Sequence, residues 1–228
     1  ADGLKGILKD NFKVNFCLEK VDRMQYVAPM VSFCDIPLSE VKEHIGKYGA
    51  YGIGLTKEWA QRKLLNPVLY INQGSDLYKC YSSLYSELIS SATMSKLSDT
   101  EKNLLNILRY FKNYEADLSR GGEVIKNYRF SDEREWRYTP NANECENIAI
   151  NKSGYDTEAK KLKINKSISE LRLEFEPNDI KYIIIERESE ISEFVEILKK
   201  SKGNKYSYHD VERLMTRIIT SEQIITDL

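Results

Sequence analysis

Hydrophobic side chains recur along the chain at two spacings, which predict short helices and strands in alternation. Leu4, Ile7 and Leu8 are three and four residues apart, as in a helix with one buried face. Residues 13–18 alternate, with Val14, Phe16 and Leu18 on one side, as in a strand. Similar patterns predict further strands at residues 28–34, 49–55, 66–71, 130–139, 171–175 and 182–185, and helices at residues 38–48, 191–198 and 209–219. This order favours an α+β fold with a mixed, mainly antiparallel sheet and flanking helices.

Two longer segments differ from this alternation. In residues 77–118, leucines recur at intervals of three and four, and Ser98 and Glu101 have the spacing of a helix capping box. We therefore expect a helical hairpin inserted into the sheet. Residues 141–166 are polar and rich in lysine, which is typical of a mobile surface loop. No internal repeat and no clear boundary divides the chain, so we predict a single domain over residues 1–228.

The charge balance limits the classes of partner. The chain has 34 Lys and Arg against 35 Asp and Glu, a formal net charge of −1. This balance excludes the strong positive field of a protein that coats nucleic acid without regard to sequence. No apolar run approaches the roughly 18 residues that a membrane-spanning helix needs, and the first residues lack the pattern of a secretory signal. We expect a cytoplasmic protein with no membrane partner.

Cysteine and histidine give no sign of a metal site. The four cysteines include no Cys-x-x-Cys pair, and the two histidines, His44 and His209, are far apart in the sequence. Neither a zinc site nor a disulfide framework is indicated, and we expect no bound metal. Cys34 and His44 could form a thiolate pair, but Cys34 ends a predicted strand and His44 lies well into the next helix. A small buried packing residue is the favoured interpretation of Cys34.

The densest group of reactive side chains lies in residues 131–138. If this segment is a strand, Glu133, Glu135 and Arg137 share one face. Two carboxylates beside a guanidinium form either a surface charge ladder or a site in which Arg orients one carboxylate while the other holds a substrate hydroxyl. On spacing alone the surface ladder is favoured.

An aromatic stripe occurs in the first helix of the predicted hairpin. Tyr78, Tyr81 and Tyr85 follow one another at intervals of three and four residues. The stripe could be a surface that binds a partner protein. Packing of the hairpin on the sheet is the favoured interpretation.

Several motifs together resemble the AbiGi family of bacterial abortive phage-resistance proteins. The most specific are residues 30–39, MVSFCDIPLS, and residues 133–138, EREWRY. The supporting matches, which extend the resemblance over nearly the whole chain, are residues 43–44, 48–49, 51–55, 57–59, 66–68 and 217–224. Members are described as one half of a two-gene system, often labelled the antitoxin, whose partner is a nucleotidyltransferase-like toxin. The resemblance therefore implies a role in phage defence and a partner encoded by an adjacent defence gene.

A more distant resemblance is to ADP-ribosyltransferases that modify nucleic acid. It implies that NAD is a substrate and that nucleic acid or protein is modified. In that fold a late strand supplies the catalytic glutamate, which here is Glu135 with Glu133 beside it, and a second strand supplies a small hydroxyl residue, which here is Ser32. Glu135 would stabilise the positive charge that develops as nicotinamide leaves, and would bind the ribose 2′-hydroxyl.

The same resemblance implies residues that would hold NAD. Tyr48 or Tyr51 would supply a ring for the nicotinamide, and Arg134 or Arg137 would hold the pyrophosphate, to which a guanidinium is well suited. The histidine that this fold carries on its opening strand has no counterpart in the sequence. The alternative is a non-catalytic antitoxin or sensor that binds a toxin protein.

Overall fold

The computed structural model describes residues 1–90, 97–120, 122–203 and 205–227. It has a mixed α+β fold with mostly antiparallel strand pairs, as predicted. The chain divides into two compact units. Unit 1 comprises Ala1–Lys13, Ile36–Leu64 and Arg172–Leu228, and unit 2 comprises Val14–Asp35 and Leu65–Leu171. The single domain stays a prediction.

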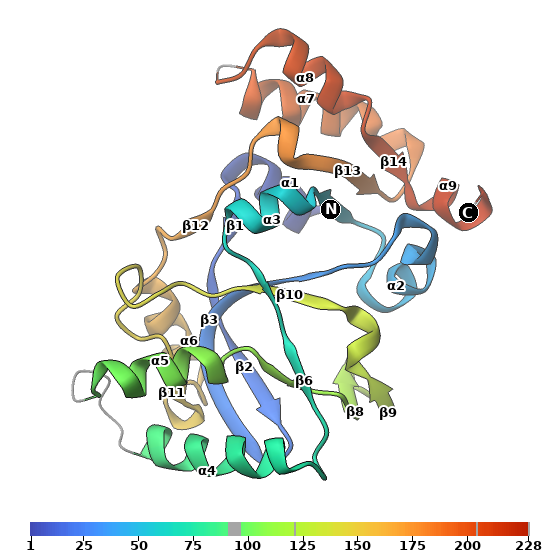
Figure 1. The fold of residues 1–228 in the computed structure, drawn as a ribbon. Coiled ribbons are helices and arrows are strands. Elements are labelled where there is room, and N and C mark those ends of the chain that lie inside the picture. The colour runs from blue at the N-terminus through green and yellow to red at the C-terminus, as the bar shows by residue number, and fades with distance from the viewer. Residues whose placement is uncertain (91–96, 121, 204, 228) are drawn as a thin grey trace. The chain divides into compact units, whose positions relative to one another are not determined.

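The long strand β3 (Met24–Cys34) organises the sheet of unit 2. It pairs in antiparallel fashion with β2 (Asn15–Val21), β10 (Glu135–Tyr138) and β11 (Ile150–Asn151), and β10 pairs in turn with β5 (Asn66–Pro67) (Figure 1). Most of the first seven residues of β3 are buried, whereas residues in its last part alternate between half-buried and exposed. The apolar half therefore belongs to the core, and the second half can carry polar groups.

The predicted helical hairpin is confirmed in its helices but wrong in its extent. Helices α4 (Asp76–Ser90) and α5 (Asp99–Leu108) pack on each other, and Ser98 and Glu101 form the capping box. The helix ends at Leu108 because the next residues pair as strands: β7 (Phe111–Asn113) lies parallel to β6 (Leu69–Ile71). The core beneath these helices contains Tyr26, Met30, Ile71, Tyr81, Leu88, Leu105, Phe111 and Ile148.

Two strands form a separate ribbon after β7. β8 (Glu115–Arg120) and β9 (Glu123–Arg129) pair with each other in antiparallel fashion. A 3₁₀ turn, η3 (Phe130–Glu133), then leads into β10. The single strand predicted over residues 130–139 is therefore wrong in its first half.

The lysine-rich segment is more ordered than a surface loop. It contains β11, the 3₁₀ turn η4 (Lys152–Gly154) and helix α6 (Glu158–Lys166). The backbone N–H of Phe16 on β2 donates a hydrogen bond to Oδ1 of Asn165 at 2.8 Å, and the hydroxyl of Tyr155 donates to the carbonyl of Phe16 at 2.6 Å. The prediction of a mobile loop is wrong because these side chains fasten the segment to β2.

Unit 1 has its own small sheet. β13 (Ile180–Ile185) lies between β4 (Gly52–Leu55), to which it is antiparallel, and β14 (Ile218–Thr220), to which it is parallel, and the short strands β1 (Phe12–Lys13) and β12 (Arg172–Leu173) form a second pair. The other elements are α1 (Asp2–Asp10), η1 (Leu38–Glu40), α2 (Val41–Tyr48), α3 (Lys57–Arg62), η5 (Pro177–Asp179), η6 (Glu188–Glu190), α7 (Ile191–Lys202), α8 (Tyr208–Met215) and α9 (Ser221–Asp227).

The prediction of one helix over residues 209–219 is wrong. Residues 209–219 do not form one helix, because Ile218–Thr220 pairs with β13 and separates α8 from α9. Among the described residues, no helix is both long and apolar enough to span a bilayer.

Candidate functional site

Strands β3 and β10 bring Ser32 and Glu135 together. Their antiparallel register places Arg137 opposite Ser32 and Glu135 opposite Cys34. Because alternate residues on a strand share a face, and opposite residues share it too, the side chains of these residues gather on one side of the sheet. Ser32 is an exposed residue, and its hydroxyl donates a hydrogen bond to Oε1 of Glu135 at 2.6 Å.

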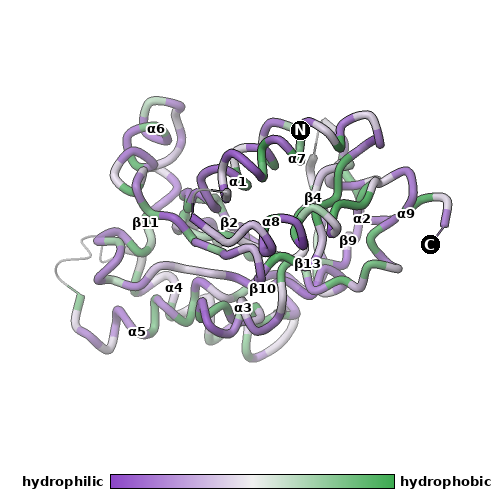
Figure 2. Tube along the Cα trace, turned by 90° about the horizontal axis from the view of Figure 1, so that it is seen from above, coloured by the Kyte–Doolittle hydropathy of each residue, from purple (hydrophilic) through white to green (hydrophobic). Residues whose placement is uncertain are grey.

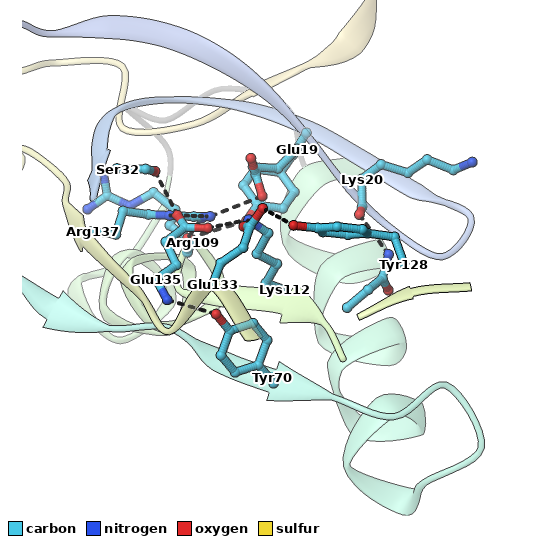
Figure 3. A network of polar contacts seen from close by, with 12 residues as sticks. Glu19, Lys20, Ser32, Tyr70, Arg109, Lys112, Tyr128, Glu133, Glu135 and Arg137 are labelled. Atoms are coloured by element: carbon cyan, nitrogen blue, oxygen red, sulfur yellow. Dashed lines mark hydrogen bonds and ion pairs between the residues drawn. The ribbon is translucent and has the colours of Figure 1, made fainter. Parts of the chain in front are cut away.

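Both carboxylate oxygens of Glu135 accept hydrogen bonds from this chain. Oε1 also accepts from Nε of Arg137 at 2.8 Å, and Oε2 accepts from Nζ of Lys112 (Figure 3). The backbone N–H of Glu135 donates to the hydroxyl of Tyr70 at 2.8 Å. With 3% of the residue exposed, Glu135 is a buried and well-partnered carboxylate.

Lys112 links Glu135 to Glu133. Nζ of Lys112 donates to Oε2 of Glu133 at 2.9 Å and lies 5.1 Å from the ring centroid of Phe130. The hydroxyl of Tyr128 donates to Oε1 of Glu133 at 3.0 Å. Figure 3 shows Lys112 from β7, Tyr128 from β9 and Glu133 from η3 converging.

Arg137 completes the network from the buried side. Its guanidinium has no solvent exposure, and donates to Glu135, to the carbonyl of Arg109 at 2.6 Å and to Oε2 of Glu19 at 3.1 Å. We call Glu19, Lys112, Glu133, Glu135 and Arg137 the ion network.

The surface charge ladder favoured on spacing is therefore wrong. Glu133 and Glu135 are 5% and 3% exposed, and Arg137 is wholly buried. Glu133 also lies in η3 rather than on the strand, and Arg134, at the C-cap of that turn, is left-handed with φ 47°. The two carboxylates meet because the turn, and not strand alternation, directs Glu133 towards Lys112.

The network fixes the charge state of Glu135. Burial alone raises the pKa of this carboxyl group, but the charges of Arg137 and Lys112 and the hydrogen bonds from Lys112 and Ser32 outweigh it, so the pKa lies below its usual value. The reciprocal effect raises the pKa of Arg137 despite its burial. At neutral pH Glu135 is a carboxylate that accepts protons poorly, so it is suited to holding positive charge and not to general acid catalysis.

Sequence reasoning missed Glu19 and Lys112. Each lies on a short or half-exposed strand, where a single charged residue is usually predicted to be solvent-exposed. Only the pairing of β2 with β3, and of β7 with β6, brings them near β10. Because both residues are far from Glu135 in the sequence, no local sequence pattern connects them with it.

The residues proposed to hold NAD do not all lie in this network. Arg134 is exposed at the turn before β10. Tyr48 and Tyr51 belong to unit 1, where Tyr48 stacks on His44 at 4.1 Å between ring centroids. The hydroxyl of Tyr51 lies 3.0 Å from Oε2 of Glu186 and 2.8 Å from Oε1 of Glu190, and donates a hydrogen bond to these carboxylates. Their role with nicotinamide stays a prediction.

The tyrosine stripe of α4 faces the core, which confirms the packing interpretation. Tyr81 is 1% exposed and its ring lies 4.7 Å from that of Phe111. The hydroxyl of Tyr78 donates to Asp22, and that of Tyr85 to the carbonyl of Gln25. The stripe is therefore not a free surface for a partner.

The cysteines give no metal centre. Within the described ranges, no group of three or more His, Cys, Asp or Glu side chains is placed to hold a metal ion. Cys34 is exposed at the end of β3, so its interpretation as a buried packing residue is wrong.

Comparison with known proteins gives two matches. The family model described as "Putative abortive phage resistance protein AbiGi, antitoxin" matches residues 10–186. The curated protein "Abortive phage resistance protein AbiGi" of Lactococcus lactis subsp. cremoris is 26% identical over 229 residues, which cover 92% of each chain. No solved structure matches.

Proposed function

Because this chain belongs to the AbiGi family of abortive phage resistance proteins, we propose that it is the antitoxin of a two-protein defence system and acts by binding the toxin. The toxin would be the product of an adjacent defence gene. In this proposal the ion network stabilises unit 2 and takes no part in a reaction.

The hydrogen bonds that the carboxylate of Glu135 accepts from its own chain support a binding role most directly. A catalytic glutamate of an ADP-ribosyltransferase must offer an oxygen to the ribose 2′-hydroxyl of NAD. Here Ser32 and Arg137 occupy Oε1, and Lys112 occupies Oε2. Donors of this chain therefore take three of the roughly four lone-pair positions of the carboxylate, and with 3% of the residue exposed a substrate hydroxyl would have to enter a buried place to reach the remaining one.

One observation favours the second candidate, an ADP-ribosyltransferase. Ser32 and Glu135, the two residues that the distant resemblance selects as second-strand hydroxyl and catalytic glutamate, lie 2.6 Å apart from oxygen to oxygen. Ser32 is exposed, which would leave one side of the pair open to a ligand. NAD as substrate and nucleic acid as target belong to this second candidate.

Two measurements on the same variants separate the candidates. One is rescue of growth in cells that express the toxin, and the other is transfer of label from adenylate-labelled NAD to RNA, DNA and protein. Ser32→Ala is the most informative variant, because it removes one hydrogen bond and leaves the ion pairs of Glu135 in place. We expect Ser32→Ala to rescue growth as the unchanged chain does, with no label transfer by either.

Label transfer by the unchanged chain, reduced on the order of a hundredfold by Glu135→Gln, would establish the enzyme instead. Glu135→Gln also breaks the buried ion pairs, so its thermal unfolding must be measured beside its activity. Ser32→Ala provides the matched variant: a loss of transfer with an unchanged unfolding midpoint points to chemistry and not to a lost fold.

A further inference from the structure

Helix α6 presents a basic face that the proposed function has not used. Residues 152–166 contain five lysines and two acidic residues, in a chain whose formal net charge is −1. Figure 2 colours most of α6 as hydrophilic. Five of the 17 Lys and Arg of unit 2 therefore lie on this short helix and the turn before it.

The ion pairs of α6 divide its lysines into two groups. Lys160 binds Asp156 at 2.8 Å and Lys161 binds Glu158 at 2.6 Å, so both acidic residues of the segment are already paired. Lys163 and Lys166 are exposed and form no ion pair with any residue that the structure describes. These two ammonium groups are available to a partner.

An apolar side chain lies among these lysines. Leu162 is 71% exposed, and at 100° per residue it shares about a third of the helix circumference with Lys166, Lys163 and the exposed Ala159. We call Ala159, Leu162, Lys163 and Lys166 the outer face of α6. Leucine favours the helix even when exposed, and a docking face gains in addition from its burial.

The outer face is held in a fixed place. Asn165, on the other side of the helix, binds the backbone of Phe16, and the side chain of Thr157 caps the first turn by accepting a hydrogen bond from the N–H of Lys160. Tyr155 binds the carbonyl of the same Phe16. A helix that is anchored before it meets a partner loses less conformational entropy on binding.

We propose that the outer face of α6 binds an acidic, partly apolar surface of the toxin. This inference rests on the proposed antitoxin function and names the surface that carries it. A protein partner is favoured over nucleic acid because the face has lysines and a leucine but no arginine and no exposed ring. Tyr155, the nearest aromatic residue in the sequence, is half-buried and binds Phe16 through its hydroxyl. Nucleic-acid surfaces typically stack bases on rings and read phosphates with arginine.

The test measures the affinity of the full chain for the purified product of the adjacent gene, by calorimetry at several salt concentrations. The variant is Lys163→Glu with Lys166→Glu, which reverses both unpaired charges. We expect its Kd to rise at least about tenfold, and the Kd of the unchanged chain to rise with salt, because exposed charges are screened beyond about 10 Å at 0.1 M. Leu162→Ala should weaken binding with little change in the salt dependence.

The matched control is Lys9→Glu with Lys200→Glu, which makes the same charge change at exposed lysines that, like Lys163 and Lys166, lie in the last turn of a helix and have no ion pair with a described residue. It should bind like the unchanged chain, and because both double variants place negative charge near helix C-termini, their thermal unfolding midpoints should fall by a similar small amount.

Three outcomes would overturn the inference. Equal affinity of the Lys163/Lys166 variant and the unchanged chain rejects the outer face while leaving the antitoxin function intact. Absence of any binding by the unchanged chain rejects both proposals together. Binding of poly(U) RNA by the unchanged chain that is lost in the variant, with toxin binding unaffected, assigns the outer face to nucleic acid.

Discussion

The guanidinium of Arg137 forms an ion pair with the carboxylate of Glu135, two residues earlier on the same strand, at 2.8 Å and without exposure to solvent. Residues at this spacing share a strand face, so the pair is local in sequence. Other side chains that bind these two side chains come from β2, β3 and β7, so the local pair also links distant segments of the chain.

This arrangement predicts that Glu135→Ala lowers the free energy of unfolding by about 3–5 kcal/mol, because it removes the carboxylate that the buried Arg137 and the half-buried Lys112 share. Urea denaturation followed by circular dichroism measures the change. The control is Asp117→Asn, which removes an exposed ion pair with Lys126 and should leave the midpoint nearly unchanged. Equal, small effects of both variants would show that the network does not stabilise the fold.

The lowered pKa of Glu135 predicts how stability depends on pH. A carboxyl group with a lower pKa in the folded than in the unfolded chain stabilises the fold above its unfolded pKa, near 4.5, and loses this contribution as the pH falls through its folded pKa. Stability should therefore drop below about pH 4.5, and Glu135→Gln should have a shallower drop. Unfolding free energies at a series of pH values between 2.5 and 7 provide the comparison. Parallel curves for the two proteins would contradict the assignment.

Tyr81 predicts a contrast between two substitutions. Its ring is buried against Phe111, but its hydroxyl finds no hydrogen-bond partner among the described residues. Tyr81→Phe should be neutral or stabilising, since it removes a buried polar group that gains nothing. Tyr81→Ala should cost about 3–5 kcal/mol through the cavity it leaves. Thermal and urea unfolding of both variants tests this, and a large loss in Tyr81→Phe would reveal an unseen partner for the hydroxyl.

The sequence predicted those elements whose pattern is local. The apolar run of β3, the capping box before α5 and the helix at α7 could be read from neighbouring residues. Phe111 could not, because it continues the helical spacing of Leu108 and becomes a strand residue only through pairing with β6. Ile218–Thr220 was likewise read as helix, and its strand form depends on β13.

The candidate site shows the same limit. Glu133, Glu135, Arg137 and Ser32 were selected from motifs, and the structure gathers them. Their burial could not be predicted, because the lysine and glutamate that neutralise them lie on strands far away in the sequence. Spacing alone therefore predicts an exposed charge ladder, because no local pattern identifies Glu19 and Lys112 as the partners of this segment.

The division of the chain into units sets an order of events during synthesis. All of unit 2 is present once residue 171 has been made, whereas β4 of unit 1, made early, pairs with β13 and needs residues 180–185. At about 5–20 residues per second, residues 172–185 follow within about 1–3 s. The ion network can therefore close on a nascent chain whose β4 still lacks its partner strand β13.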